Sequence, residues 1–385
     1  MAKTYQEINK RISQGDAVVL TAEEMTEMVE GSGVEKAARE VDVVTTGTFG
    51  AMCSSGAFLN FGHSDPPIRM QDITLNDVPA YAGIAAVDAY IGATQVPRGD
   101  ETFRYGGGHV IEDLVSGKDI HLKAFSSGSD CYPRSEMDTH IRLQELNQAY
   151  MFNPRNGYQN YACATNSSER VLKTYMGTLK PNYGNVTFAT SGELSPLLND
   201  PEYRTIGIGT SVWLAGARGH VAWEGTQFNV NAPRSSNGVP KRPAGALALA
   251  GNLKEMDPAF LKGMTYAGYG ATLGVGFGIP IPVLDEKMAR ATAVSNSDIS
   301  TAVFDYSQST RSRTPVREVT YRELQSGKID IDGREVRTSH LSDLNRARTI
   351  ACRLKDLVRK GDFPLTEPIR GFPIEREFKP LNRRD

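Results

Sequence analysis

Apolar residues at helical spacing mark the first forty positions of the chain. They alternate with charged residues in "TYQEINKRISQ", a pattern typical of an amphipathic helix, and the regularity breaks at Ala17 to Leu20, which predicts a short strand. Thr21 follows as the expected cap of a second helix. Further on, "VDVVTTGTFGAMCSSGAF" predicts a buried strand that opens into a glycine-rich turn, with Cys53 just past the strand's end. Ligands gather at such strand ends in α/β folds, so this turn is a candidate site.

Three strand-like runs in the middle of the chain are "NVTFATS", "TIGIGTSVWLAG" and "HVAWEGTQFNV". They lie close enough together in sequence to predict a meander. The segment 231–245 after them is rich in proline, glycine and serine, so we expect an exposed loop or an internal boundary there.

The pattern becomes regular again after Thr314. Residues 316–338 predict a helix and a small hairpin with a turn at Asp332 and Gly333. An amphipathic helix follows within 341–361, where Ser342 is the expected cap and Gly361 the expected stop.

Together these elements predict an α/β protein with mixed sheets and flanking helices, in which two subdomains are allowed. We expect one catalytic unit over 1–370, with 231–245 as the candidate internal boundary. Residues 371–385, rich in charge, are expected to form a surface tail.

The composition is that of an ordinary globular protein. The 385 residues are 39% hydrophobic and 23% charged, and 43 basic against 45 acidic side chains leave a net charge of −2. This balance gives no reason to expect nucleic acid as a partner. The N-terminus lacks the apolar core of a signal peptide, and no apolar run approaches the roughly 18 residues of a membrane helix. We therefore expect a cytoplasmic protein that does not contact membranes.

The cysteines lie far apart in a chain without a secretory signal, so free thiols are expected rather than disulfides. No C-x-x-C pair occurs, which argues against a zinc ribbon or a ferredoxin-type cluster, and the spacing predicts no metal site. Cys352 falls inside the helical segment 341–361 and is expected to serve only in packing.

Cys131 stands in "FSSGSDCYPR", among polar residues that are unusual neighbours for a packing cysteine. Arg134 follows it, and "PRSEMDTHIRLQEL" has helical spacing, so a helix is expected to begin just after the thiol. A cation and a helix N-terminus both stabilise the reactive thiolate, whereas the carboxylate of Asp130 opposes it. The alternative is a loop cysteine with no role.

Cys53 is the second candidate thiol. Gly47, Gly50 and Gly56 allow backbone amides to approach a ligand or to stabilise an anionic sulfur. His63 lies near enough in sequence to fold back as a proton carrier. The alternative is tight packing of small residues around a structural thiol, with His63 as an ordinary hydrogen-bonding side chain.

Tyr161 and Cys163 alternate in "NYACATNSSER", which predicts a strand with the thiol on one face. If Cys53, Cys131 and Cys163 converged, they could hold an iron–sulfur cluster, although spacing alone does not show this. The glycine run over 263–284 completes no phosphate-binding pattern. It indicates close backbone packing or a loop that covers a ligand.

Four stretches of this sequence resemble the homocysteine-biosynthesis family, the L-aspartate-semialdehyde sulfurtransferases of anaerobic microbes. They are "GTFGAMCSSGAFLNFGHSDPPIRM", "SGSDCYPR", "TNSSERVLKTYMGTLKPNYGN" and "GIGTSVWLAGARGHVAWEGTQF". The resemblance runs from the N-terminus to about residue 365.

The resemblance implies that sulfide sulfur is added to the aldehyde carbon of L-aspartate semialdehyde and that reduction then yields homocysteine. It implies a protein persulfide, for which Cys131 is the expected carrier, while Cys53 helps to form, resolve or reduce it. No cofactor is firmly implied. The resemblance suggests an external electron donor in the form of a ferredoxin-like partner protein, and we expect a homo-oligomer.

The implied substrate carries an α-carboxylate and an ammonium group. From charge type alone, Arg134 or Arg218 is the candidate to bind the carboxylate, and Asp130 or Glu224 the candidate to bind the ammonium. Many family members continue into a pair of nucleotide-sensing modules, whereas this sequence stops at Asp385, so feedback by an adenosyl ligand is not expected.

Two alternatives to this function stay open at the level of sequence. In the first, the same sulfur insertion depends on an iron–sulfur cluster held by the three cysteines named above. In the second, the chain is a noncatalytic sulfur carrier or scaffold that docks a redox partner.

Overall fold

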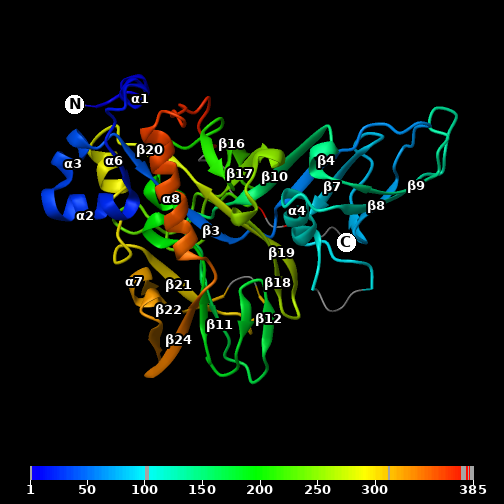
Figure 1. Ribbon diagram of the computed structural model, residues 1–385. Helices are drawn as coiled ribbons and strands as arrows, with labels where there is room; N and C mark the ends of the chain where they lie inside the picture. Colours follow the sequence, from blue (N-terminus) through cyan, green and yellow to red (C-terminus); the bar gives the residue numbers. More distant parts are fainter. Residues whose placement is uncertain (1, 100–103, 311–312, 374–378, 380, 382–385) are drawn as a thin grey trace.

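The computed structural model describes residues 2–99, 104–310, 313–373, 379 and 381. Its largest sheet is antiparallel and occupies the middle of the molecule (Figure 1). The strands of this sheet, in spatial order, are β18 (Leu261–Tyr266), β19 (Gly270–Gly278), β15 (Ser211–Leu214), β16 (Ala217–Glu224), β17 (Leu247–Asn252), β10 (Gln148–Asn156), β4 (Gly56–Asn60) and β7 (Asp88–Gly92), and β3 (Thr48–Ala51) also pairs with β19.

A second sheet, mixed in direction, lies beside the first. Its strands, in spatial order, are β22 (Pro315–Thr320), β21 (Ser300–Asp305), β11 (Cys163–Thr165), β14 (Val186–Phe188), β24 (Arg334–His340) and β23 (Lys328–Ile331). A smaller mixed sheet joins β1 (Val19–Thr21), β2 (Val43–Thr45) and β20 (Pro280–Pro282), and β12 (Leu172–Thr174) forms a hairpin with β13 (Gly177–Leu179).

The remaining sheet is called the arm below. It consists of β6 (Val78–Ala80), β5 (Asp72–Leu75), β8 (Ile120–Phe125) and β9 (Glu136–Ile141). Figure 1 shows β8 and β9 projecting from the body on the side opposite α2 and α3.

Helices flank these sheets, which confirms the predicted α/β class with mixed sheets. They are α1 (Tyr5–Gln14), α2 (Ala22–Ser32), α3 (Val34–Glu40), α4 (Gly107–Val115), α5 (Pro196–Asn199), α6 (Glu286–Ala291), α7 (Tyr321–Gln325) and α8 (Leu344–Arg359), with short 3₁₀ helices at Leu143–Glu145, Gly192–Leu194, Leu253–Glu255 and Pro258–Phe260. None of the helices within the described residues has the length and apolar character needed to cross a membrane.

One contiguous apolar core joins the arm to the body. Ile73 and Leu122 of the arm are fully or almost fully buried in the same cluster as Leu59 and Met151 of the largest sheet. Because interiors are close-packed, a sheet that shares its core in this way is held as part of the body. The second sheet has its own cluster, which includes Cys163.

Several local predictions are confirmed. The strand at Val19–Thr21 leads into α2, where the Thr21 side chain and Glu24 form a capping box. The hairpin of β23 and β24 turns at Asp332 and Gly333, whose φ angles of 51° and 77° suit this tight turn.

The predicted meander is wrong in part. β15 and β16 pair with each other, as expected, but β14 belongs to the second sheet and pairs with β11 and β24. The strands β15 and β16, which come next in sequence, are therefore not neighbours of β14 in a sheet. Segment 231–245 contains no helix or strand, and its role as a boundary stays a prediction.

The helix predicted after Pro133 is also wrong. Residues 136–141 form β9, an edge strand of the arm, whose Phe125–Glu136 and His121–His140 pairings with β8 override the helical spacing. The thiol of Cys131 therefore has no helix N-terminus behind it.

α8 begins one residue later than the predicted cap implies. Asp343, rather than Ser342, caps it by accepting a hydrogen bond from the Arg346 amide, while Gly361 follows its end with a φ of 80°, as expected of a stop. Cys352 was expected to pack but is exposed, because the helix buries the opposite stripe through Ala351 and Leu354.

The predicted tail 371–385 lies largely outside the described residues. At its start, Phe372 is buried, with its ring centroid 5.3 Å from that of Tyr203 and 5.5 Å from that of Phe228. The beginning of the segment is thus anchored to the body.

Candidate active site

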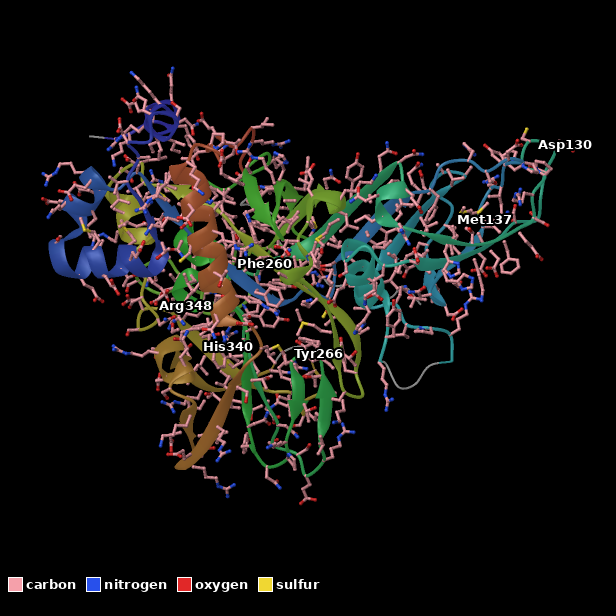
Figure 2. All side chains as sticks on the ribbon, viewed as in Figure 1. Asp130, Met137, Phe260, Tyr266, His340 and Arg348 are labelled. Atoms are coloured by element: carbon pink, nitrogen blue, oxygen red, sulfur yellow. The ribbon has the colours of Figure 1, made fainter. Side chains whose placement is uncertain are left out.

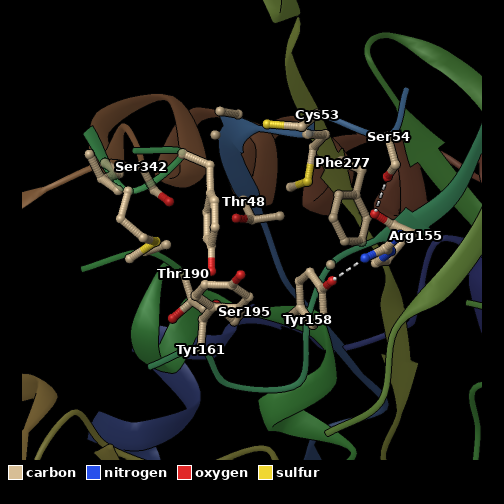
Figure 3. Close-up of a pocket in the computed structure, with 18 of the residues that line it drawn as sticks. Thr48, Cys53, Ser54, Arg155, Tyr158, Tyr161, Thr190, Ser195, Phe277 and Ser342 are labelled. Atoms are coloured by element: carbon tan, nitrogen blue, oxygen red, sulfur yellow. Dashed lines mark hydrogen bonds between the residues drawn. The ribbon is translucent and has the colours of Figure 1, made fainter. Parts of the chain in front are cut away.

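A cavity of about 540 Å³ lies between the largest sheet and the second sheet. β3, β10 and β19 and the turns beside them supply one wall, and the β12–β13 hairpin with residues 189–197 supplies the other. Figure 3 shows Cys53, Arg155 and the tyrosines at 158 and 161 bordering this pocket. The cavity therefore contains a thiol, a cation and several phenols.

Cys53 lies in the turn that joins β3 to β4, as the sequence predicts. The neighbouring Met52 amide donates to the carbonyl of Leu273 at 2.8 Å, and the Ser54 hydroxyl is 2.8 Å from both the Asn153 side-chain oxygen and the carbonyl of Arg155 (Figure 3). These bonds fasten the turn to β19 and β10. The thiol is thus held by two strands of the largest sheet.

The environment of the Cys53 sulfur has opposing effects on its ionisation. Burial raises the pKa of the Cys53 thiol, whereas the Thr272 hydroxyl, which donates to the sulfur at 3.2 Å, and the positive charge of Arg155 lower it. The net pKa is raised, so at neutral pH the protonated thiol predominates.

Alkylation of Cys53 by iodoacetamide is expected to be slow at neutral pH and to accelerate with a midpoint above about 8.5, the ordinary thiol value, because only the thiolate reacts. Mass spectrometry of the Cys53 peptide across a pH series measures this midpoint, and circular dichroism at each pH checks the fold. A midpoint at or below the ordinary value would contradict the raised pKa.

The glycines around Cys53 serve mainly in close packing. A side chain at Gly47 would place Cβ 2.2 Å from the Ala347 carbonyl oxygen of α8, and one at Gly56 would place it 2.2 Å from the Tyr90 ring. Gly50, in contrast, lines the cavity. The run 263–284 contains the β18–β19 hairpin, in which Gly263 packs tightly against His109, so close packing is confirmed there.

Arg155, near the end of β10, is a site residue that sequence reasoning missed. Its Nε donates to the Thr226 hydroxyl at 3.1 Å, and an Nη donates to the Tyr158 hydroxyl at 3.4 Å. Its sequence context, "NPRNGYQNY", pairs a base with tyrosines, which is the signal that could have drawn attention to it.

Tyrosines form much of the cavity wall and were also missed. Burial raises the pKa of Tyr158, Tyr161 and Tyr269, and it raises that of Tyr266 to about 12. These phenols are therefore neutral at physiological pH and keep their O–H donors. A developing oxyanion in the cavity has such donors nearby.

Cys131 lies away from this cavity, in the exposed loop at the tip of the arm between β8 and β9. Figure 2 shows Asp130 at the far end of the arm, whereas Tyr266 of the cavity lies in the body. His63, expected to serve Cys53, instead stacks on Tyr132 with ring centroids 6.0 Å apart. Within one chain, His63 and Cys131 thus share the arm tip, and Cys53 does not join them.

None of the side chains predicted to bind substrate lines the cavity. Arg134 donates to the carbonyls of Asp65 and Pro66 at the arm, close to the exposed Asp130. Arg218 packs over the Phe363 ring and donates to the Pro364 carbonyl at 2.9 Å.

Glu224, the other expected ammonium ligand, is buried in β16. The binding roles given to these charged residues stay predictions.

The three cysteines of the cluster alternative occupy separate parts of the chain. Cys163 lies in β11, which confirms the predicted strand, and it is completely buried, so burial raises its pKa. Cys53 lines the cavity and Cys131 is exposed on the arm. Among the described residues, no group of three or more His, Cys, Asp or Glu side chains is placed to hold a metal ion. This arrangement does not support a cluster held by all three.

Comparison with known proteins identifies the family. A family model described as "Homocysteine biosynthesis enzyme, sulfur-incorporation" matches residues 17–365. An L-aspartate semialdehyde sulfurtransferase of Methanosarcina acetivorans is 51% identical over 383 residues, covering 99% of this chain and 74% of that protein. One of Methanocaldococcus jannaschii is 50% identical over 381 residues, covering 95% and 72%. No solved structure matches. The chain therefore belongs to the homocysteine-biosynthesis family of sulfur-incorporation enzymes.

Proposed function

We propose that this chain is an L-aspartate semialdehyde sulfurtransferase, which adds sulfide-derived sulfur to the aldehyde carbon and gives homocysteine after reduction. Membership of the family and the names of two relatives that are half identical to the chain support this function. The observation that carries it is a cysteine thiol and a guanidinium in one cavity large enough for a small amino acid.

The overall reaction joins the aldehyde, hydrogen sulfide, two electrons and two protons, and it yields homocysteine and water. The electrons are needed because replacing the carbonyl oxygen by sulfur gives a thioaldehyde, which is two electrons more oxidised than a thiol. An external donor supplies them, and a ferredoxin-like protein is the proposed partner.

Cys131 and Cys53 form and use the persulfide as a pair. Hydrosulfide attacks the Cys131 sulfur of a Cys53–Cys131 disulfide, which gives a Cys131 persulfide and a free Cys53 thiolate. The terminal persulfide sulfur then attacks the aldehyde carbon. Cys53 attacks the Cys131 sulfur and re-forms the disulfide, and the bond that breaks releases the added sulfur as the thiolate of a geminal hydroxythiol. This hydroxythiolate takes up a proton and loses water to give the thioaldehyde that the external electrons reduce.

The cavity suits the addition step. Attack on the aldehyde places negative charge on its oxygen, and neutral phenols such as Tyr266 are available to donate to it. The Arg155 charge opposes the effect of burial on Cys53 and so helps it to act as a thiolate.

The two cysteines are brought together by a second copy of the chain, in keeping with the proposed homo-oligomer. The arm shares its core with the body, so swinging the whole arm toward its own cavity would break buried contacts. An exposed tip on one copy is free to enter the cavity of another.

Turnover by the isolated protein tests the function. We expect the purified chain, under anaerobic conditions with L-aspartate semialdehyde, isotopically labelled sulfide and a chemical reductant, to form homocysteine that carries the labelled sulfur. Mass spectrometry detects the product. A yield no higher than in a reaction without protein would refute the proposal.

A further inference from the structure

Arg155 has hydrogen-bonding capacity that the protein does not use. A guanidinium carries five N–H donors, and the bonds to Thr226 and Tyr158 occupy two of them. The other three have no partner among the described residues. A partly buried guanidinium in a cavity wall is costly without an acceptor, so these donors indicate an anionic ligand.

The charge balance of the cavity leads to the same conclusion. Within the described part of the chain, no Asp, Glu, Lys or His side chain lines the pocket, and Arg155 is its single charged group. The cavity thus has a net positive charge. It favours a ligand that carries a negative charge and provides no carboxylate for a ligand's ammonium group.

Arg155 and the Cys53 thiol stand on directly joined segments of the same cavity wall. The Ser54 hydroxyl, next to Cys53, hydrogen-bonds to the backbone carbonyl of Arg155 at 2.8 Å. The thiol-bearing turn and the guanidinium-bearing strand are therefore directly joined. In L-aspartate semialdehyde, three carbon–carbon bonds separate the aldehyde carbon from the carboxylate carbon.

We infer that Arg155 binds the carboxylate of the aldehyde substrate and that the cavity selects aldehydes by this acid group rather than by the amino group. This inference rests on the proposed function and assigns the substrate class of the same site. A planar guanidinium with three free donors suits a carboxylate because it can donate two hydrogen bonds to it.

The amino group finds only uncharged partners among the described lining residues, namely tyrosine rings and neutral polar side chains such as Gln227. Tyr158, Tyr161 and Tyr269 line the cavity, and an ammonium over a phenol ring gains about 0.5–2 kcal/mol. Removal of the amino group is therefore expected to cost about twofold to thirtyfold in kcat/KM. Removal of the carboxylate is expected to cost about 100-fold, as for a lost charged hydrogen-bonded pair.

Three aldehydes and three variants test the inference. The substrates are L-aspartate semialdehyde, 4-oxobutanoate, which lacks the amino group, and 3-aminopropanal, which lacks the carboxylate. Arg155→Gln is expected to lower kcat/KM for the two acids about 100-fold more than for 3-aminopropanal, mainly through KM, because the weaker support of the Cys53 thiolate affects all three aldehydes alike. Arg155→Lys should restore part of the loss, and Arg334→Gln, on an exposed hairpin strand, should change nothing. An equal loss with all three aldehydes would overturn the inference.

A second measurement does not depend on turnover. L-homoserine, the unreactive alcohol with the same skeleton, is expected to protect Cys53 of the wild-type chain from iodoacetamide, whereas 3-amino-1-propanol is not. Arg155→Gln should remove the protection by L-homoserine. Equal protection by both alcohols, or protection that survives Arg155→Gln, would overturn the inference.

The two measurements separate the inference from the function. Protection by L-homoserine that depends on Arg155, in a chain that makes no homocysteine, refutes the proposed function and supports the inference. Homocysteine formation without any such dependence refutes the inference alone.

Discussion

Replacing Cys53 by alanine is expected to abolish homocysteine formation, with kcat/KM lower by about a thousandfold or more. The proposed cycle uses this thiol to release the product and to re-form the disulfide, and no other cysteine lines the cavity among the described residues. A serine cannot replace it, because an alcohol does not exchange with disulfides. Cys53→Ala and Cys53→Ser should therefore be equally inactive in the labelled-sulfide assay.

The chain offers a matched control in Cys352, an exposed thiol on α8. Cys352→Ala should keep full activity, which shows that loss of a cysteine as such does no harm. Cys53→Ala should keep the far-ultraviolet spectrum and melting temperature of the wild type within a few degrees, since the side chain is small and only partly buried. Activity of Cys53→Ala within tenfold of the wild type, with the fold intact, would remove this residue from the mechanism.

Local sequence pattern was enough to place Cys53. The buried run that ends in β3, the turn, and the start of β4 are adjacent in the chain, so their order follows from the change of pattern alone. The same holds for the caps of α2 and for the Asp332–Gly333 turn, each of which depends on residues a few positions apart.

Long-range pairing explains what the sequence did not reveal. β14 is joined to β24 through Val186–Thr338 and Phe188–His340, residues about 150 positions apart, and no local pattern encodes that choice. Residues 136–141 have helical spacing, yet β8 provides a strand edge for them to pair with. Tertiary contacts outweigh a weak local preference in both cases.

In the candidate active site, too, local sequence pattern located some residues and long-range pairing was needed for others. Arg155 stands about 100 positions after Cys53, and the two meet because β10 pairs with β4, which follows the Cys53 turn. Charge type alone selected Arg134 and Arg218, since it carries no information about which strand end reaches the cavity. The family resemblance pointed to Cys53 and Cys131, and the fold was needed to place the first in the cavity and the second on the exposed arm tip.

Cys131 is the position of the second large expected effect, and its surroundings favour the proposed action between two copies. The tip loop is fixed to the arm by backbone hydrogen bonds from Ser126 to Ser135 at 2.8 Å and from Arg134 to Pro67 at 3.2 Å. The Ser127 amide also donates to the Gln71 side chain at 2.7 Å. The thiol is therefore presented outward on an ordered loop, and Cys131→Ser is expected to lower kcat/KM about a thousandfold because no persulfide forms.

Complementation between two inactive variants distinguishes action between copies from action within one chain. Cys53→Ala and Cys131→Ser, co-expressed with different affinity tags and purified through both, give assemblies in which one copy supplies Cys53 and the other supplies Cys131. In a dimer, one of the two sites is then complete, so about half of the wild-type activity per assembly is expected. Each variant purified alone should stay inactive. Mixed assemblies without activity, or chains that do not co-purify, would show that Cys131 does not act on the Cys53 of a second copy, because a cysteine that serves only its own chain cannot be rescued by a neighbour.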